Sequence, residues 1–185
     1  MQQILSAATI GTTQVAVVTG NAVTIPTNKG WYIDLTLNSG ERVVNTPVLR
    51  SGALVVTSTQ PASSQCATGG SSFLYVINYA TGSAFPSPQF TVNGNTNLNT
   101  GNTVTNGSQG ANDSVVPIGT SLGAGFFADA TVVNTTSCSG TGCGAGAPPP
   151  GYYYVYNCPE SGASCTPRLM KGSLKHRIAW WEVRQ

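Results

Sequence analysis

The chain reads Ala-Leu-Val-Val-Thr-Ser at residues 53–58 and Ser-Phe-Leu-Tyr-Val-Ile-Asn-Tyr at residues 72–79, and these two stretches decide its fold class. Both are short, apolar and rich in β-branched and aromatic residues, which is typical of buried strands. Residues 47–50 are also strand-like, and Ser51-Gly52 stands between them and the first stretch. Residues 47–58 therefore predict a tight hairpin, with a further strand at 72–79.

Strand signals continue on both sides of this hairpin. Residues 31–37 alternate apolar and polar side chains, as a half-buried strand does. Further strands are predicted at residues 14–18, 41–44, 130–133, 152–156 and 177–183. No long segment has a helical period with caps, and residues 2–8 are compatible with one short helical turn. The sequence thus predicts an all-β fold of antiparallel sheets.

Two long stretches interrupt the strand pattern. Residues 83–112 are rich in Asn, Gly and Thr, with little apolar content beyond Phe85, Phe90, Val92 and Leu98. Residues 137–150 are rich in Gly, Ala and Ser and end in three prolines. Both are expected to be long polar surface loops or insertions in a single domain of residues 1–185. Long loops in compact domains are usually functional or disordered.

Composition points to an extracellular protein. Hydrophobic residues make up 40% of the 185 residues, but charged residues only 8%, where about 25% is usual. The net charge of +2 is too small for an electrostatic nucleic-acid footprint, so no nucleic-acid partner is expected. No apolar run approaches the roughly 20 residues that span a bilayer. Residues 1–5 also lack the basic start and apolar core of a secretory signal.

Five cysteines favour an oxidising compartment. Local disulfides Cys138–Cys143 and Cys158–Cys165 are the simplest pairing, because each pair is close in sequence within a turn-rich segment. Cys66 is then left over, and it either pairs outside this chain or displaces one of these pairings. A zinc site is the competing interpretation, but the spacings are wider than in zinc knuckles and His176 is the only histidine.

Catalytic constellations are missing from the sequence. A serine hydrolase needs a base beside its nucleophile, and the only histidine is in a basic run. A glycosidase needs two carboxylates in different environments, and the six acidic residues are scattered. We therefore expect no catalytic residues and no enzymatic activity.

Three ordered segments resemble the type IV pilus tip adhesins of the PilC/PilY family. The first is Lys-Gly-Trp-Tyr-Ile-Asp-Leu at residues 29–35, followed by Ser-Gly-Glu-Arg-Val-Val at 39–44. The second runs from the hairpin at residues 47–58 through Pro61, Cys66 and Gly69-Gly70 to the strand that begins at Ser72. The third is Arg-Ile-Ala-Trp-Trp-Glu-Val at residues 177–183. Their order and spacing agree with the C-terminal part of the family.

This resemblance implies the last section of a larger modified β-propeller, located extracellularly at the cell surface, at the pilus tip or outer membrane. It implies a non-enzymatic adhesin or pilus biogenesis domain, with minor pilins of the tip and an external surface or receptor as partners. The binding residues remain unknown. Two alternatives stay open: a structural surface or fibre domain, and a carbohydrate-binding module that uses exposed Trp and Tyr side chains.

One segment departs from the family. Many members carry an acidic loop of calcium-binding type where this chain has Phe-Thr-Val-Asn-Gly-Asn-Thr-Asn-Leu-Asn at residues 90–99. Thr91, Asn95 and Asn99 occupy acidic positions, and Asn93 keeps the register. Calcium takes six to eight oxygen ligands, and its affinity depends on ligand charge. We therefore predict that this degenerate loop binds no metal, so that the calcium of related proteins is lost and no cofactor is needed.

Overall fold

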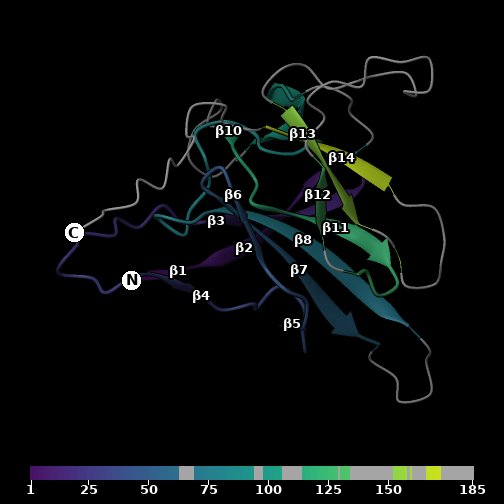
Figure 1. The fold of residues 1–185 in the computed structure, drawn as a ribbon, viewed down its shortest axis with the longest axis horizontal. Coiled ribbons are helices and arrows are strands. Elements are labelled where there is room, and N and C mark those ends of the chain that lie inside the picture. The colour runs from purple at the N-terminus through teal and green to yellow at the C-terminus, as the bar shows by residue number, and fades with distance from the viewer. Residues whose placement is uncertain are drawn as a thin grey trace, which may run out of the picture.

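The computed structural model describes residues 1–62, 69–93, 98–105, 114–128, 130–133, 152–157, 159 and 166–171. All five cysteines, and hence both expected disulfides, lie outside these residues, as do His176 and the strand expected at 177–183. Nearly all of the regular structure described is β, and Figure 1 shows long strands side by side in one twisted sheet.

A seven-stranded antiparallel sheet forms the centre of the fold. Its path runs β2 (Leu5–Ile10), β3 (Thr13–Val18), β11 (Gly119–Ala124), β8 (Gly70–Asn78), β7 (Ala53–Pro61) and β5 (Arg42–Val43). β6 (Val48–Arg50) also pairs with β7, at the other end of that strand from β5. The expected hairpin at residues 47–58 is therefore confirmed as β6 and β7.

Smaller sheets surround the central one. β1 (Gln2–Gln3) pairs in parallel with β4 (Tyr32–Ile33), and β9 (Val104–Thr105) pairs with β10 (Ser114–Val115). A third sheet holds β12 (Thr131–Val133), β13 (Tyr152–Asn157) and β14 (Thr166–Lys171). One 3₁₀ turn, η1, spans Thr100–Asn102. The prediction of an all-β fold built on antiparallel sheets is confirmed.

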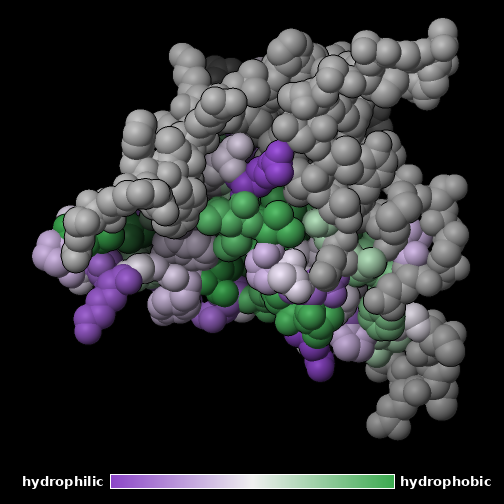
Figure 2. All heavy atoms as spheres, in the orientation of Figure 1, coloured by the Kyte–Doolittle hydropathy of each residue, from purple (hydrophilic) through white to green (hydrophobic). Residues whose placement is uncertain are grey.

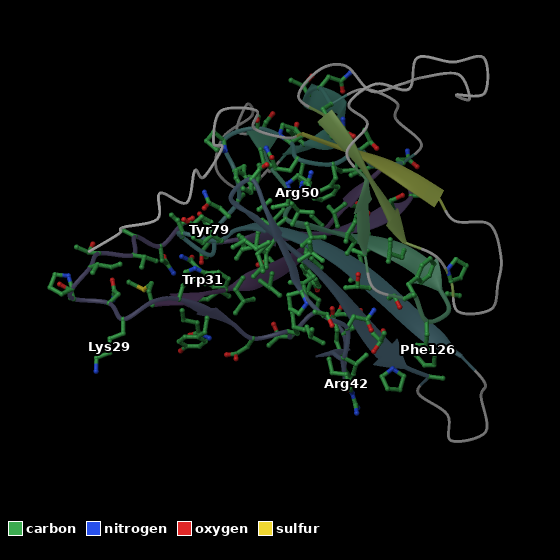
Figure 3. All side chains as sticks on the ribbon, in the orientation of Figure 1. Lys29, Trp31, Arg42, Arg50, Tyr79 and Phe126 are labelled. Atoms are coloured by element: carbon green, nitrogen blue, oxygen red, sulfur yellow. The ribbon has the colours of Figure 1, made fainter. Side chains whose placement is uncertain are left out.

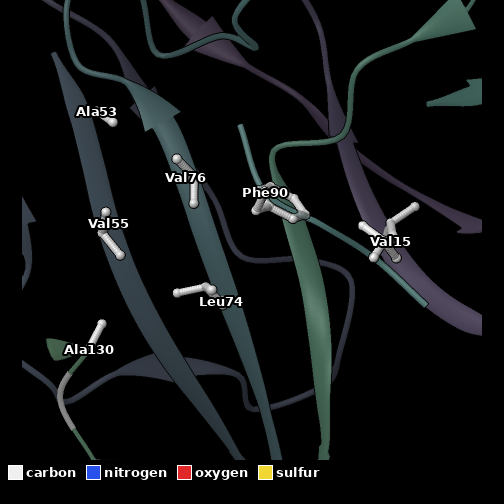
Figure 4. Packing of buried hydrophobic residues seen from close by; sticks show 8 residues of the cluster. Val15, Ala53, Val55, Leu74, Val76, Phe90 and Ala130 are labelled. Atoms are coloured by element: carbon white, nitrogen blue, oxygen red, sulfur yellow. The ribbon is translucent and has the colours of Figure 1, made fainter. Parts of the chain in front are cut away.

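Both faces of the central sheet are buried. In the β7–β8 register Val55 pairs with Val76, and both belong to one core cluster, which Figure 4 shows together with Leu74 and Phe90. The next pair, Val56 and Tyr75, belongs to a second cluster on the opposite face. Because both faces are covered, β8 is apolar without alternation from Phe73 to Ile77.

Irregular chain covers each of these faces. Trp31, Ile33, Leu35 and Leu37 pack against the second cluster, while the residues between them are exposed. The expected alternation of residues 31–37 therefore holds for burial, although only Tyr32–Ile33 enters a strand. A strand ladder is not needed for an alternating segment to cover an apolar face.

The first cluster is covered by part of the segment 83–112. Phe90 and Val92 are 1% and 0% exposed and lie among the core residues of this face. The expectation that this segment is a surface loop is therefore wrong for these residues. Two bulky apolar side chains in a polar stretch are enough to anchor it to the sheet, since each gains about 1.5–3 kcal/mol on full burial.

The expected helical turn at residues 2–8 is also wrong, because these residues lie in β1 and β2. A seven-residue segment gains little from helix formation alone, whereas β2 pairs with β3 over six residue pairs. Within the described residues, none lies in a helix long and apolar enough to cross a membrane.

Candidate functional site

The loop of calcium-binding type begins directly after core residue Phe90. Thr91 is 7% exposed, and Asn93 is exposed with a left-handed φ of 55°. Asn99 precedes η1 and accepts a hydrogen bond from the Gly101 amide at 2.9 Å, so it caps this turn. Asn95 lies outside the described residues. The side-chain oxygen of Asn99 is therefore engaged by the protein's own backbone.

Asn102, which the sequence did not single out, closes this loop. Its side chain is fully buried, and its Oδ1 accepts the Val92 backbone N–H at 2.8 Å. Its Nδ2 lies 3.4 Å from both the backbone oxygen and the side-chain Oδ1 of Asn99. One amide group thus joins the two ends of the loop, because it offers an acceptor on one side and donors on the other.

This geometry shows how the loop is held without carboxylates. A bound cation would be coordinated by oxygen atoms of the loop. Here the Nδ2 group of Asn102 instead lies near the oxygens of Asn99. Among the described residues there is no group of three or more His, Cys, Asp or Glu placed to hold a metal ion. Absence of calcium binding remains a prediction, supported by the lack of anionic ligands at Thr91, Asn93 and Asn99.

A hydrogen-bonded cluster around one carboxylate, that of Glu41, lies on the other side of the sheet. Glu41 Oε1 accepts hydrogen bonds from Tyr75 Oη at 2.7 Å and from Ser58 Oγ at 2.5 Å. Its Oε2 accepts one from Asn38 Nδ2 at 3.0 Å. Burial, together with the hydrogen bond to Glu41 and its charge, raises the pKa of Tyr75 far above that of a free tyrosine.

This cluster serves the fold rather than chemistry at the surface. Tyr75 is 1% exposed and Ser58 is fully buried, so a substrate has no access to either hydroxyl. Glu41 satisfies both hydroxyls and joins the chain before β5 to the centre of β7 and β8. A buried network whose members all have partners fixes one arrangement of the strands.

A carbohydrate-binding module would use exposed aromatic side chains, but the contacts of Trp31 are internal. Its Nε1–H donates to the Tyr79 backbone oxygen at 2.8 Å. One face of its ring packs on Gly82, whose φ of 68° and contact with the indole leave no room for a side chain. Figure 3 shows Trp31 and Tyr79 close together at one end of the sheet. Trp31 therefore closes the turn after β8. The other two tryptophans lie outside the described residues.

Exposed apolar side chains gather along the outer segment, which we define as residues 42–50. This segment runs beside β7 and contains β5 and β6. Val43, Val44 and Leu49 are 43%, 65% and 60% exposed. Figure 2 shows hydrophobic residues reaching the surface in the middle of the face in view, between polar ones. Such a group is a candidate contact surface for a partner.

Gln3 is another structural residue that sequence reasoning missed. It is fully buried, and its Nε2 donates to the backbone oxygens of Asn21 and Thr81 at 2.7 and 2.9 Å. Its Oε1 accepts from Thr19 Oγ1 and from the Asn21 amide, both at 3.0 Å. All of its hydrogen-bonding capacity is used, so one side chain ties β1 to two distant loops.

Comparison with known proteins finds similarity to type IV pilus proteins in part of the sequence and in the fold. No family model matches the chain. A type IV pilus biogenesis factor PilY1 homolog from Xylella fastidiosa is 37% identical over 73 residues, which are 37% of this chain and 5% of that protein.

The crystal structure of the Pseudomonas aeruginosa PilY1 C-terminal domain has the same fold. It superposes with a TM-score of 0.62 at 14% identity, over 93% of this chain and 31% of that one. The chain thus spans a small part of the curated relative and about a third of the solved one. The resemblance read from the sequence is confirmed.

Proposed function

Starting from the PilY1-type family assignment that the partial sequence match and the shared fold support, we propose that this chain is a non-enzymatic part of a type IV pilus adhesin. It is associated with the type IV pilus and hence with the cell surface. The finer proposal is that it belongs to the pilus tip, contacts minor pilins there and helps the pilus attach to an external surface or receptor. It needs no cofactor for this role.

The observation that carries this proposal is the 37% identity to a type IV pilus biogenesis factor. The structure adds support of a different kind. The hydroxyls of Ser58 and Tyr75 beside Glu41 are inside the fold, and the outer segment exposes apolar side chains, which suits a contact surface better than an active site.

The outer segment is the first surface to test, because it exposes the apolar side chains of Val43, Val44 and Leu49, and its charged residues are Arg42 and Arg50 at its two ends. In the full-length protein in its host, Val44→Lys combined with Leu49→Lys should lower attachment about tenfold, which corresponds to roughly 1.4 kcal/mol. Attached cells and surface pili are counted in the same cultures. Thr12→Lys, at an exposed turn outside this segment, is the matched control.

Three results separate the possible roles. Reduced attachment with normal pilus numbers supports adhesion through the outer segment. Reduced pilus numbers place the segment in pilus biogenesis instead of attachment. The proposed association with pili is wrong if deletion of residues 1–185 from the full-length protein changes neither pilus number nor attachment.

A further inference from the structure

The chain around β5, which we define as the anchored segment of residues 38–44, is held to the central sheet by a short ladder. β5 makes only two residue pairs with β7. Before the segment, Leu37 packs against the second core cluster. After it, the Asn45 side chain donates to a backbone oxygen in the chain that follows β11. Between these two fixed points, the attachment of the segment depends on its side-chain contacts to the sheet.

The Glu41 carboxylate makes the contacts that reach the centre of the sheet. Its Oε1 accepts hydrogen bonds from Ser58 in β7 and from Tyr75 in β8, at 2.5 and 2.7 Å. Its Oε2 accepts one from Asn38 Nδ2 at 3.0 Å, within the segment itself. Both hydroxyls are buried. Because hydrogen bonds to a charged group are about twice as strong as those between neutral groups, these contacts depend on the charge of the carboxylate.

The neighbouring elements offer Glu41 no ion pair within the described residues. β7 contains no charged or titratable side chain, and β8 contains only Tyr75. Arg42 is exposed, and its Nε donates to the Gly40 backbone oxygen at 3.2 Å. Asp34, in the segment that covers the same face, is exposed as well. The hydrogen bonds described to the Glu41 carboxylate therefore come from neutral donors.

We infer that Glu41 is a pH-sensitive switch, which fixes the anchored segment to the sheet when it is ionised and releases the segment when it is protonated. A proton removes the charge, so the bonds from Ser58 and Tyr75 fall to the strength of neutral ones. It also turns one carboxyl oxygen into a donor, which faces the Nδ2 donor of Asn38. The attachment is thus complete at neutral pH and is lost as the pH falls through the titration of Glu41.

The release is local. Leu37 and Asn45 keep their own contacts, so the opening ends at these residues. β7 and β8 stay paired with each other over nine residue pairs. Val43 and Val44 are freed with the segment, whereas Leu49 remains in β6 on the same edge of β7. This inference concerns the fold of the chain and does not depend on the proposed pilus role.

Glu41→Gln tests the switch at neutral pH, because glutamine has the shape of protonated glutamate and cannot ionise. The reporter is the backbone amide of residue 41, which donates to the Asn38 oxygen at 3.1 Å. The reference is the Val76 amide, which donates to the Ile118 oxygen. In hydrogen exchange of the chain of residues 1–185, the protection factor of the residue 41 amide should fall at least about tenfold in the variant, while that of Val76 is unchanged.

Two comparisons make this result specific. Asp34→Asn removes a charge of the same sign at an exposed position, and as the matched control it should leave both protection factors unchanged. Trypsin cleavage at neutral pH is the second readout. Glu41→Gln should accelerate cleavage after Arg42 about tenfold, and cleavage after Arg50 in β6 should keep its rate.

The wild-type chain tests the effect of acid. Lowering the pH to about 3, below the range in which an ordinary glutamate ionises, should reduce the protection factor of the residue 41 amide to its value in Glu41→Gln. The variant itself should change little between neutral pH and this pH. Protection factors are calculated against an unstructured peptide at each pH, so that the intrinsic dependence of exchange on pH cancels.

Four results would overturn the inference. The first is a Glu41→Gln variant that protects the residue 41 amide as well as the wild type does at neutral pH. The second is an acid loss of the same size in both proteins, which would assign it to other groups. The third is a loss at Val76 that follows the loss at residue 41, and the fourth is a variant that circular dichroism shows to be unfolded. Either of these last two would mean that Glu41 supports the whole sheet and not one segment.

Discussion

The ring of Tyr75 lies over Gly119 of the neighbouring strand and fills the space that any larger residue at position 119 would need. The two residues are direct partners in the β8–β11 register. A Cβ atom on Gly119 would stand 2.7 Å from Tyr75 Cδ1 and 3.1 Å from Ala16 Cβ. β11 can therefore lie between β3 and β8 only because it has no side chain at this point.

Gly119→Ala should destabilise the fold by about 1–3 kcal/mol, because Tyr75 and Ala16 are both buried and cannot move away. Urea unfolding followed by tryptophan fluorescence measures this change. Gly20→Ala is the matched control, since a Cβ at Gly20 meets nothing within 4 Å. A Gly119→Ala variant as stable as Gly20→Ala would contradict the packing described.

Tyr75 should make the fold sensitive to alkali. Its pKa is raised in the folded state by burial and by Glu41, whereas an unfolded tyrosine has a pKa of about 10. The stabilisation is therefore complete below pH ~10 and is lost above it, where only the unfolded state ionises. The free energy of unfolding, measured by urea titration from pH 8 upward, should fall above pH ~10.

Two phenylalanine variants separate Tyr75 from the other tyrosines. Tyr75→Phe should remove much of the alkaline loss, at the expense of the hydrogen bond to Glu41. Tyr32→Phe, at a 53% exposed position, should retain it. An alkaline loss that is identical in both variants would show that other groups cause it.

Asn102→Ala should open the loop around η1. The buried Val92 amide would lose its acceptor, which costs about 1–3 kcal/mol. Asn99→Ala removes an exposed cap and should cost less, about 1 kcal/mol. Urea unfolding gives both values, and exchange of the Val92 amide should accelerate in Asn102→Ala. A larger loss of unfolding free energy in Asn99→Ala than in Asn102→Ala would show that the cap at Asn99, and not Asn102, holds the loop closed.

Calcium should neither bind to this protein nor change its thermal stability. Addition of millimolar calcium or removal of divalent ions with EDTA should leave its melting temperature unchanged, because the described loop positions offer no carboxylate. Isothermal titration calorimetry should show no binding. Micromolar binding that Asn95→Ala abolishes would show that the loop remains a metal site.

Gln3→Met should be strongly destabilising although it conserves size. It leaves the Asn21 amide and two backbone oxygens without their partner, at about 1–3 kcal/mol for each buried group that stays unsatisfied. Gln2→Met is the matched control, since Gln2 is exposed and its side chain donates to Asp34, which is exposed as well. Thermal melts of the two variants measure the difference, and equal melting temperatures would argue against the role of Gln3.

The parts of the fold that sequence predicts are those where apolar residues are dense. β7 and β8 can be predicted from the sequence, because both of their faces are buried and their apolar residues are therefore continuous. β11 escapes prediction because Gly119 and Ser121 lack the bulk that marks a strand, and its neighbours Tyr75 and Ala16 supply the packing instead. β2 is not predicted either. It is a strand because it pairs with β3, and the sequence of residues 5–10 alone does not reveal that pairing.

The candidate site was predictable in its chemistry and not in its geometry. The loss of carboxylates at Thr91 and Asn99 can be read directly. The role of Asn102 cannot be read from the sequence, because nothing distinguishes it from the other asparagines of this segment until its burial is known. Gln3 presents the same difficulty, since a buried amide with four partners and a solvated one have the same sequence signature.

β11 is made last of the seven strands in the central sheet, yet it stands between β3 and β8. The chain is synthesised from its N-terminus, so the hairpin of β2 and β3 and the group around β7 and β8 both precede β11. Each of them then has one strand edge without its final partner. They become one body only after residue 124 has appeared. The central sheet can therefore close only once β11 has been synthesised, and until then β3 and β8 each lack the neighbour that β11 supplies.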